Sequence, residues 1–159
     1  MHVTLFGEVR LNYTDWAQDL IRKGLEKPFL YFIMSNPGKQ SIIVIDEKGK
    51  RQKLNVPGLY AIYQGNDCLY VGFSGTNVWY RLSRFKKELI GMSRPDENHP
   101  GAARAREKGY TTDLLYKVKF IPLDEVITEK FAHLGLDESH VDEYIAPLLN
   151  SKFNKKVRK

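Results

Sequence analysis

The sequence predicts a mixed α/β fold, in which helices flank a small antiparallel β-sheet. Two apolar, aromatic-rich runs at residues 58–63 and 68–73 are separated by the turn-forming Gln64-Gly65-Asn66-Asp67, which is typical of a β-hairpin. Residues 78–89 follow, with apolar side chains spaced four, three and four positions apart, as on one face of a helix. A β-rich run at residues 111–121 adds a third long strand. Helices packed on such a sheet form an α/β sandwich.

The first 55 residues are expected to form an N-terminal extension before this hairpin. A helix is predicted to begin near Thr14-Asp15, where an N-capping residue precedes a helical apolar pattern. Two β-rich runs, Phe29–Met34 and Ser41–Ile45, flank the turn signal Asn36-Pro37-Gly38. This arrangement predicts a second hairpin within the extension.

Residues 56–159 are expected to form the core domain. After the helix that follows the hairpin, a polar loop leads into a short helix over residues 102–108. Gly109 ends that helix, because glycine is favoured just past a helix C-terminus. Beyond the third strand, a helix over about residues 123–134 and a final helix leading to Pro147 complete the domain.

The composition is that of an ordinary globular domain, with 42% hydrophobic and 28% charged residues. No apolar run approaches the ~20 residues that span a bilayer. The N-terminal Met1-His2-Val3-Thr4-Leu5 lacks the charged and apolar regions of a secretion signal. Cys68 is the single cysteine, so no intramolecular disulfide can form. We therefore expect a cytoplasmic protein with no membrane partner.

The charge of the chain favours a polyanionic partner. The net charge is +6 and the isoelectric point is near 9.3, and five of the last eight residues are lysine or arginine. Clustered cations are the usual electrostatic footprint of binding to a phosphate backbone, although a solvated basic surface would give the same composition. The candidate DNA contacts are Lys86, Lys87, Arg104, Arg106, Lys152 and Lys155.

Two short motifs in the hairpin at residues 58–73 point to a function. Gly58-Leu59-Tyr60 and Tyr70-Val71-Gly72, followed by Arg81, resemble the signature of the GIY-YIG nuclease superfamily, small metal-dependent enzymes that cut DNA. The resemblance implies that the two tyrosines and Arg81 are catalytic. Arg81 would bind the scissile phosphate, since a guanidinium offers a rigid fork of donors, and Arg84 could share this role. Without the tyrosine pair, both arginines would be better explained as solvated charges on a helix.

The two tyrosines must lie on one face of the hairpin if they share a site. Strand side chains alternate between faces, and directly paired residues of neighbouring strands lie on the same face. Tyr60 and Tyr70 therefore share a face only when the residue numbers of each cross-strand pair add up to an even number. A two-residue Gly65-Asn66 turn by itself would put them on opposite faces. The resemblance therefore predicts a wider loop or a β-bulge here.

A late acidic residue also fits the resemblance. The family carries a glutamate nine residues before a proline and twelve before an asparagine, and Glu138, Pro147 and Asn150 have this spacing. Helical periodicity places Glu138 within about 20° of the apolar Ile145. An inward-facing carboxylate needs a compensating charge, and one carboxylate with waters suits Mg²⁺ or Mn²⁺. In the alternative interpretation, Glu138 is a first-turn residue favoured by the helix dipole.

Two positions leave alternatives open. Asn150 either ties the chain after the helix to the sheet or simply ends the helix. Many family members have a histidine or tyrosine four residues after the arginine, where this chain has Phe85. Proton transfer would then fall to Tyr60 as general base, or to His99 if folding brings this loop histidine close. A lone loop histidine more often has no such role.

Together these features predict a divalent-metal-dependent DNA endonuclease that hydrolyses phosphodiester bonds. A chain of this length has no room for a separate DNA-binding domain, so recognition would come from residues 1–55, residues 92–110 and the basic tail. This economy favours a restriction-type enzyme over a homing or repair-type nicking nuclease. Cutting both strands would need a homodimer or two successive events. The alternatives are a DNA-binding module of the same fold that has lost catalysis, which Phe85 keeps open, and a structural protein whose tyrosines only pack.

Overall fold

The computed structural model describes residues 18, 30–33, 43–46, 48–52, 54–92, 98–112, 114–122 and 145–154. In this part of the chain, helices and an antiparallel sheet form the mixed α/β arrangement that the sequence predicts. The strands are β1 (Leu30–Ile33), β2 (Ile43–Ile45), β3 (Gly58–Gln64), β4 (Asp67–Ser74) and β5 (Tyr116–Pro122). Among the described residues they form a five-stranded sheet in the order β2-β1-β5-β3-β4, and each neighbouring pair is antiparallel.

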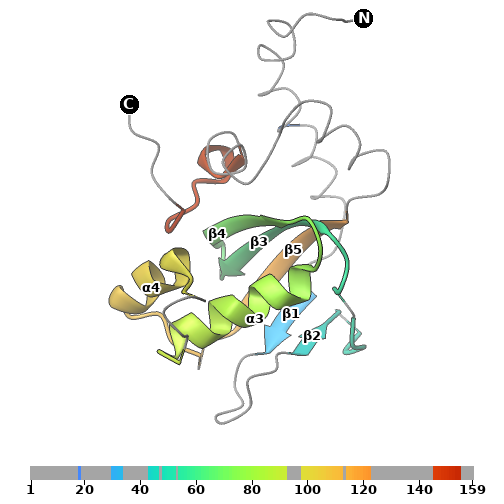
Figure 1. Ribbon diagram of the computed structural model, residues 1–159, viewed down its shortest axis with the longest axis horizontal. Coiled ribbons are helices and arrows are strands. Elements are labelled where there is room, and N and C mark those ends of the chain that lie inside the picture. Colours follow the sequence, from blue (N-terminus) through green and yellow to red (C-terminus); the bar gives the residue numbers. More distant parts are fainter. Residues whose placement is uncertain are drawn as a thin grey trace, which may run out of the picture.

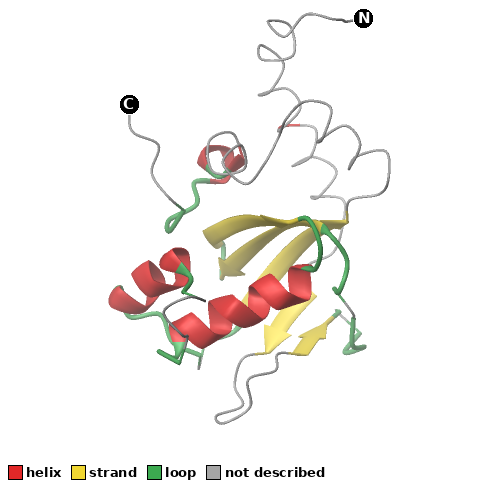
Figure 2. Ribbon diagram, in the orientation of Figure 1, coloured by secondary structure: helices red, strands yellow, loops and turns green. Residues whose placement is uncertain are grey.

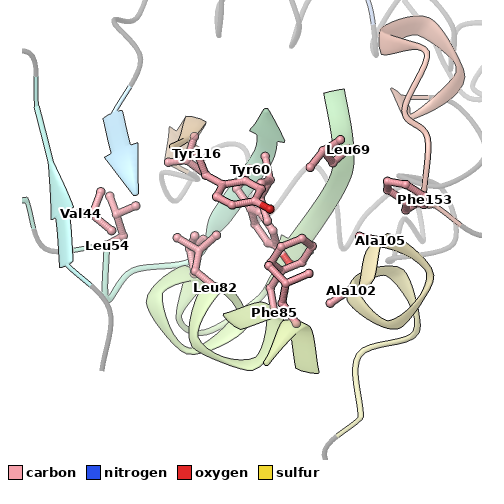
Figure 3. Close-up of a cluster of buried hydrophobic side chains, with 14 residues drawn as sticks. Val44, Leu54, Tyr60, Leu69, Leu82, Phe85, Ala102, Ala105, Tyr116 and Phe153 are labelled. Carbon is pink, nitrogen blue, oxygen red and sulfur yellow. The ribbon is translucent and has the colours of Figure 1, made fainter. Parts of the chain in front are cut away.

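Two helices, α3 (Val78–Leu89) and α4 (Pro100–Glu107), accompany this sheet. Figure 1 shows α3 running across one face of the sheet with α4 beside it, and Figure 2 shows the same layers by element type. The core lies between these layers. Leu82 and Phe85 of α3 point toward Tyr60 and Tyr116 of the sheet (Figure 3), and all four side chains are at most 3% exposed.

The hairpin of β3 and β4 contains the predicted bulge. Its turn has only two residues, Gly65-Asn66, but the register shifts by one residue just beyond the turn. As a result Tyr60 pairs with Gly72, and Ile62 pairs with Tyr70. Because residues two apart on a strand share a face, Tyr60 and Tyr70 lie on the same face of the sheet. The bulge, and not a wider loop, meets the condition that the resemblance sets.

An N-cap and a row of apolar side chains on one face account for helix α3. The side chain of Asn77 accepts a hydrogen bond from the backbone N–H of Tyr80 at 3.1 Å, which satisfies one of the free donors of the first turn. The apolar positions predicted for the inner face are all buried; they are Val78, Leu82, Phe85 and Leu89. The predicted helix and its inner face are therefore confirmed.

Strand β5 begins five residues later than predicted. The hydroxyl of Tyr116 donates to the backbone carbonyl of Thr111 at 2.8 Å, so the chain folds back on itself before the strand starts. The β-branched Thr111 and Thr112 and the apolar leucines at positions 114 and 115 resemble the start of a strand, but this local contact takes precedence over propensity.

The sheet contains strands from both sides of residue 55, where the sequence predicts a domain boundary. β1 pairs with both β2 and β5, so the second hairpin extends the sheet of the core. Val44 and Leu54 are buried in the same cluster as Leu82. Of the helix predicted after Thr14-Asp15, the structure describes only Gln18, which is helical. The helix predicted over about residues 123–134 lies outside the described residues, as does the part of the final predicted helix before residue 145. No helix in the described part of the chain has the length and apolar composition needed to cross a membrane.

Residues 151–154, called here the C-terminal strap, run along β4. The backbone N–H of Phe153 donates to the carbonyl of Leu69 at 2.9 Å. The side chain of Asn154 bonds twice to Val71, because its Oδ1 accepts from the backbone N–H and its Nδ2 donates to the carbonyl, both at 2.8 Å. The amide of Asn154 thus makes the two hydrogen bonds that a residue of a neighbouring strand would make.

Candidate active site

Tyr60 lies on the helix-facing side of β3, with its ring over Gly72 of β4. Its exposed fraction is 3%. A Cβ at residue 72 would lie 2.3 Å from both Cζ and Oη of Tyr60, far inside van der Waals contact. The glycine of the second motif is therefore needed to make room for the tyrosine of the first.

Replacing Gly72 with alanine is expected to displace the Tyr60 ring and to lower the free energy of unfolding by roughly 1–3 kcal/mol, the usual cost of overpacking. Urea unfolding measures this loss. Gly75→Ala is the matched control, because a Cβ there would meet only Phe73 at 3.8 Å, an ordinary contact. Equal stability of the two variants would contradict the steric argument.

Tyr70 lies beside Tyr60 on the same face, with ring centroids 6.3 Å apart. Its ring also contacts Phe85 of α3, at 6.3 Å, and His99 just before α4, at 4.6 Å. A Cβ at Gly101 would lie 2.6 Å from Cδ1 of Tyr70. The first turn of α4 therefore packs closely against this tyrosine.

Arg81 and Arg84 are half-buried on α3, and the positive charge of each lowers the pKa of His99. Both guanidinium groups are therefore near the loop that carries this histidine. The guanidinium of Arg84 also lies 5.7 Å from the centroid of the Tyr80 ring, a cation–π distance. The ring of Phe85 stands 5.3 Å from His99. The fold thus gathers the following predicted site residues into one region: Tyr60, Tyr70, Arg81, Arg84 and His99.

His99 is buried and caps α4. Its Nδ1 accepts a hydrogen bond from the backbone N–H of Ala102 at 3.1 Å. Burial, together with the charges of Arg81 and Arg84, lowers the pKa of His99 to about 4. We therefore assign a neutral ring at pH 7 with its proton on Nε2, since Nδ1 is already an acceptor. Folding brings His99 to the tyrosines, but in this state its Nε2 already carries a proton and cannot accept another one.

Glu88 is buried in this region, and no motif of the sequence singles it out. Its Oε1 accepts from the backbone N–H of His99 at 3.1 Å, and its Oε2 lies 3.1 Å from Nη1 of Arg106. Seven residues separate Glu88 from Arg81, about two helical turns, so both lie on the same flank of α3. That spacing is the sequence signal that would have identified it.

Three of the cations predicted to contact DNA are buried or hydrogen-bonded within the protein. Lys86 is only 1% exposed, and burial lowers the pKa of its ammonium group. Arg104 donates from Nε and Nη2 to the carbonyl of Phe153, at 3.0 and 2.5 Å. Arg106 bonds both the carboxylate and the backbone carbonyl of Glu88. These arrangements differ from the expectation of cations that face a ligand.

The other three cations of that group are placed differently. Lys87 is half-buried on α3. Lys152 is exposed, and its Nζ lies 3.5 Å from Oδ2 of Asp67 in an ion pair at the protein surface. Lys155 lies outside the described residues. Lys87 and Lys152 therefore stay candidates for contact with a phosphate backbone.

The predicted carboxylate, Glu138, lies outside the described residues. Within the described ranges, no group of three or more His, Cys, Asp and Glu side chains is arranged to hold a metal ion. Asn150 is exposed and adopts a left-handed conformation, φ 51°, at the end of the short helix η3 (Pro147–Leu149). Asn150 therefore fits the helix-ending alternative, and the bond to the sheet is made by Asn154.

Comparisons of the chain with protein-family models, with curated proteins and with solved structures found no match. What the protein does is therefore inferred from its motifs and from the geometry of this region.

Proposed function

We propose that the protein is a divalent-metal-dependent DNA endonuclease of the GIY-YIG type. The observation that supports this most is the position of the two motif tyrosines. Tyr60 and Tyr70 lie on one face of the hairpin with ring centroids 6.3 Å apart. Arg81 lies near His99, which itself contacts Tyr70. Phenol and guanidinium groups in one place are donors suited to a phosphodiester.

Each residue has a role in this proposal. Arg81 binds the scissile phosphate and stabilises the negative charge that develops on its oxygens in the transition state. Tyr60 orients the attacking water and is the candidate general base, because Nδ1 of His99 is already occupied. Water adds across a P–O bond, which leaves a 5′-phosphate on one product and a 3′-hydroxyl on the other.

Glu138 is the proposed ligand of Mg²⁺ or Mn²⁺, cations that prefer oxygen donors. When bound, such a cation offsets charge on a non-bridging phosphate oxygen.

Cleavage of supercoiled plasmid DNA tests the proposed activity. We expect nicked or linear product with Mg²⁺ or Mn²⁺ and none in the presence of EDTA. Glu138→Gln keeps the size of the side chain but removes its charge, so this variant is expected to lose cleavage. Glu107→Gln, at an exposed position of α4, is the matched control and should cut like the wild type. Equal cleavage by wild type and Glu138→Gln would contradict the role of Glu138.

The pattern of cleavage products distinguishes the kinds of nuclease. A restriction-type enzyme gives discrete fragments from a long DNA, whereas random nicking or branch-specific cutting points to another role. Cutting of both strands at one site would also require two copies of the chain or two successive events.

A second candidate function is DNA binding without cleavage. The observation that favours it is Phe85, an apolar ring packed against Tyr70 and His99 where the family often has a polar group. Salt-dependent binding with no cleavage under any divalent cation would support this candidate.

A further inference from the structure

The ring of Tyr70 has a close partner in the first turn of α4. A Cβ at Gly101 would lie 2.6 and 2.7 Å from Cδ1 and Cε1 of Tyr70, and 3.2 Å from Cε1 of His99. The aromatic ring therefore rests on a backbone that has no side chain to hold it off. This contact joins residues 31 positions apart in the sequence, so it depends on how α4 packs against the hairpin.

His99 fixes this turn in place. Its Nδ1 caps the helix through the N–H of Ala102, and its own backbone N–H donates to Glu88 of α3. The imidazole stands edge-on to the ring of Tyr70 at 4.6 Å and to that of Phe85 at 5.3 Å. One residue thus holds the start of α4 to both the hairpin and α3.

Arg106 completes the connection. Its guanidinium bonds the carboxylate and the backbone carbonyl of Glu88, so α4 is tied to α3 at two points along its length. Helix α3 also carries Arg81. A continuous set of contacts therefore sets the position of Tyr70 relative to Arg81, the two groups that must meet the same phosphate.

We infer that His99 and Gly101 are positioning residues for Tyr70, and that the first turn of α4 holds this tyrosine in register with Arg81. The inference rests on the proposed nuclease function. It gives His99 a role other than proton transfer, and it gives Arg106 a role other than DNA contact. Phe85 serves as the apolar support of the same cluster.

Gly101→Ala tests this inference. Alanine is the more favourable residue in a helix, so a loss cannot come from helix propensity. We expect kcat for DNA cleavage to fall by roughly 10- to 100-fold, as small misplacements of reacting groups do, with KM changed by less than about twofold. Gly75→Ala, which meets no close atom, should keep the wild-type kcat within about twofold. An unchanged kcat in Gly101→Ala would overturn the inference.

A second readout separates this inference from the proposed function. In protein labelled with 3-fluorotyrosine, the fluorine resonance of Tyr70 is the one missing from Tyr70→Phe. Gly101→Ala should shift this resonance, and Gly75→Ala should not. If the wild type cuts no DNA, the proposed function fails, and the shift alone decides whether α4 positions Tyr70. An unshifted resonance would overturn the positioning role.

A loss of folding in Gly101→Ala is also informative. The double variant Tyr70→Leu/Gly101→Ala removes the ring that the new methyl group would strike. It is expected to unfold at the same urea concentration as Tyr70→Leu alone. A double variant that is much less stable than Tyr70→Leu would show that Gly101 acts elsewhere, and would contradict the inference.

Discussion

Replacing Arg81 with alanine is expected to lower the rate of DNA cleavage by about 10²- to 10³-fold, the usual effect of removing one donor that stabilises transition-state charge. Arg81 is half-buried on α3, four residues before Phe85, and its positive charge acts on the nearby His99. Single-turnover cleavage of a labelled duplex measures the rate. Arg81→Lys keeps the charge but loses the planar fork, so it should recover only part of the rate.

The control for this prediction is Arg51→Ala. Arg51 is exposed and forms an isolated β-bridge with Ile45 of β2, outside the proposed site, so its loss should leave the rate within about twofold. Circular dichroism and urea unfolding establish that both variants are folded. Wild-type cleavage by Arg81→Ala would refute the proposed role of this residue, whatever the outcome for Glu138.

The second large effect concerns stability in acid. Burial first, and then the charges of Arg81 and Arg84, lower the pKa of His99 to about 4, from an ordinary value near 6.5, while the nearby Glu88 opposes this shift. Above pH 6.5 the ring is neutral in both the folded and the unfolded chain. Below that pH the unfolded chain takes up a proton that the folded chain does not, so stability falls as the pH falls. The loss from this one group is about 3 kcal/mol between pH 6.5 and pH 4.

His99→Asn isolates this contribution. Asparagine is also a good N-cap, so it can accept the N–H of Ala102, but it does not titrate. The variant is expected to be less stable than wild type at pH 7.5, because the ring packing is lost. Between pH 6.5 and pH 4, however, its free energy of unfolding should fall by about 3 kcal/mol less than that of the wild type. Urea unfolding at several pH values between 4 and 7.5 measures the difference. The other three histidines are present in both proteins, so parallel curves would contradict the low pKa.

Arg81→Ala gives a further check on the cause. Removing one positive charge should raise the pKa of His99 in the folded protein, so the acid loss of stability should still begin near pH 6.5 but should end at a higher pH and be smaller. Arg51→Ala should leave the pH dependence unchanged. The result does not depend on whether the protein cuts DNA.

The sequence predicts those parts of the fold that depend on local pattern. If Tyr60 and Tyr70 share a face, the parity of strand side chains requires a wider loop or a bulge between them, and the structure has the bulge. Helical spacing is enough to identify the buried face of α3. Gly109 ends α4 one residue after its cap, as expected for glycine with a φ of 92°. In each case the controlling residues are neighbours in the chain.

The parts that the sequence does not predict depend on partners far along the chain. Arg104 bonds a carbonyl 49 positions away, and Asn154 bonds Val71 across 83 positions. No spacing rule distinguishes Asn154 from Asn150, or a cation that contacts DNA from one that holds a carbonyl. His99 is similar, because its neutral state follows from burial and from two arginines that approach it only in the folded protein.

The C-terminal strap has a consequence for how two copies of the chain could meet. Among the described strands, β4 stands at one end of the sheet, and such an edge offers free N–H and C=O groups that can recruit a strand from another molecule. Here the strap occupies backbone groups of Cys68, Leu69 and Val71. Strand exchange or continuous sheet formation between copies is blocked along this stretch. A dimer that cuts both strands of DNA would therefore have to assemble through a different surface.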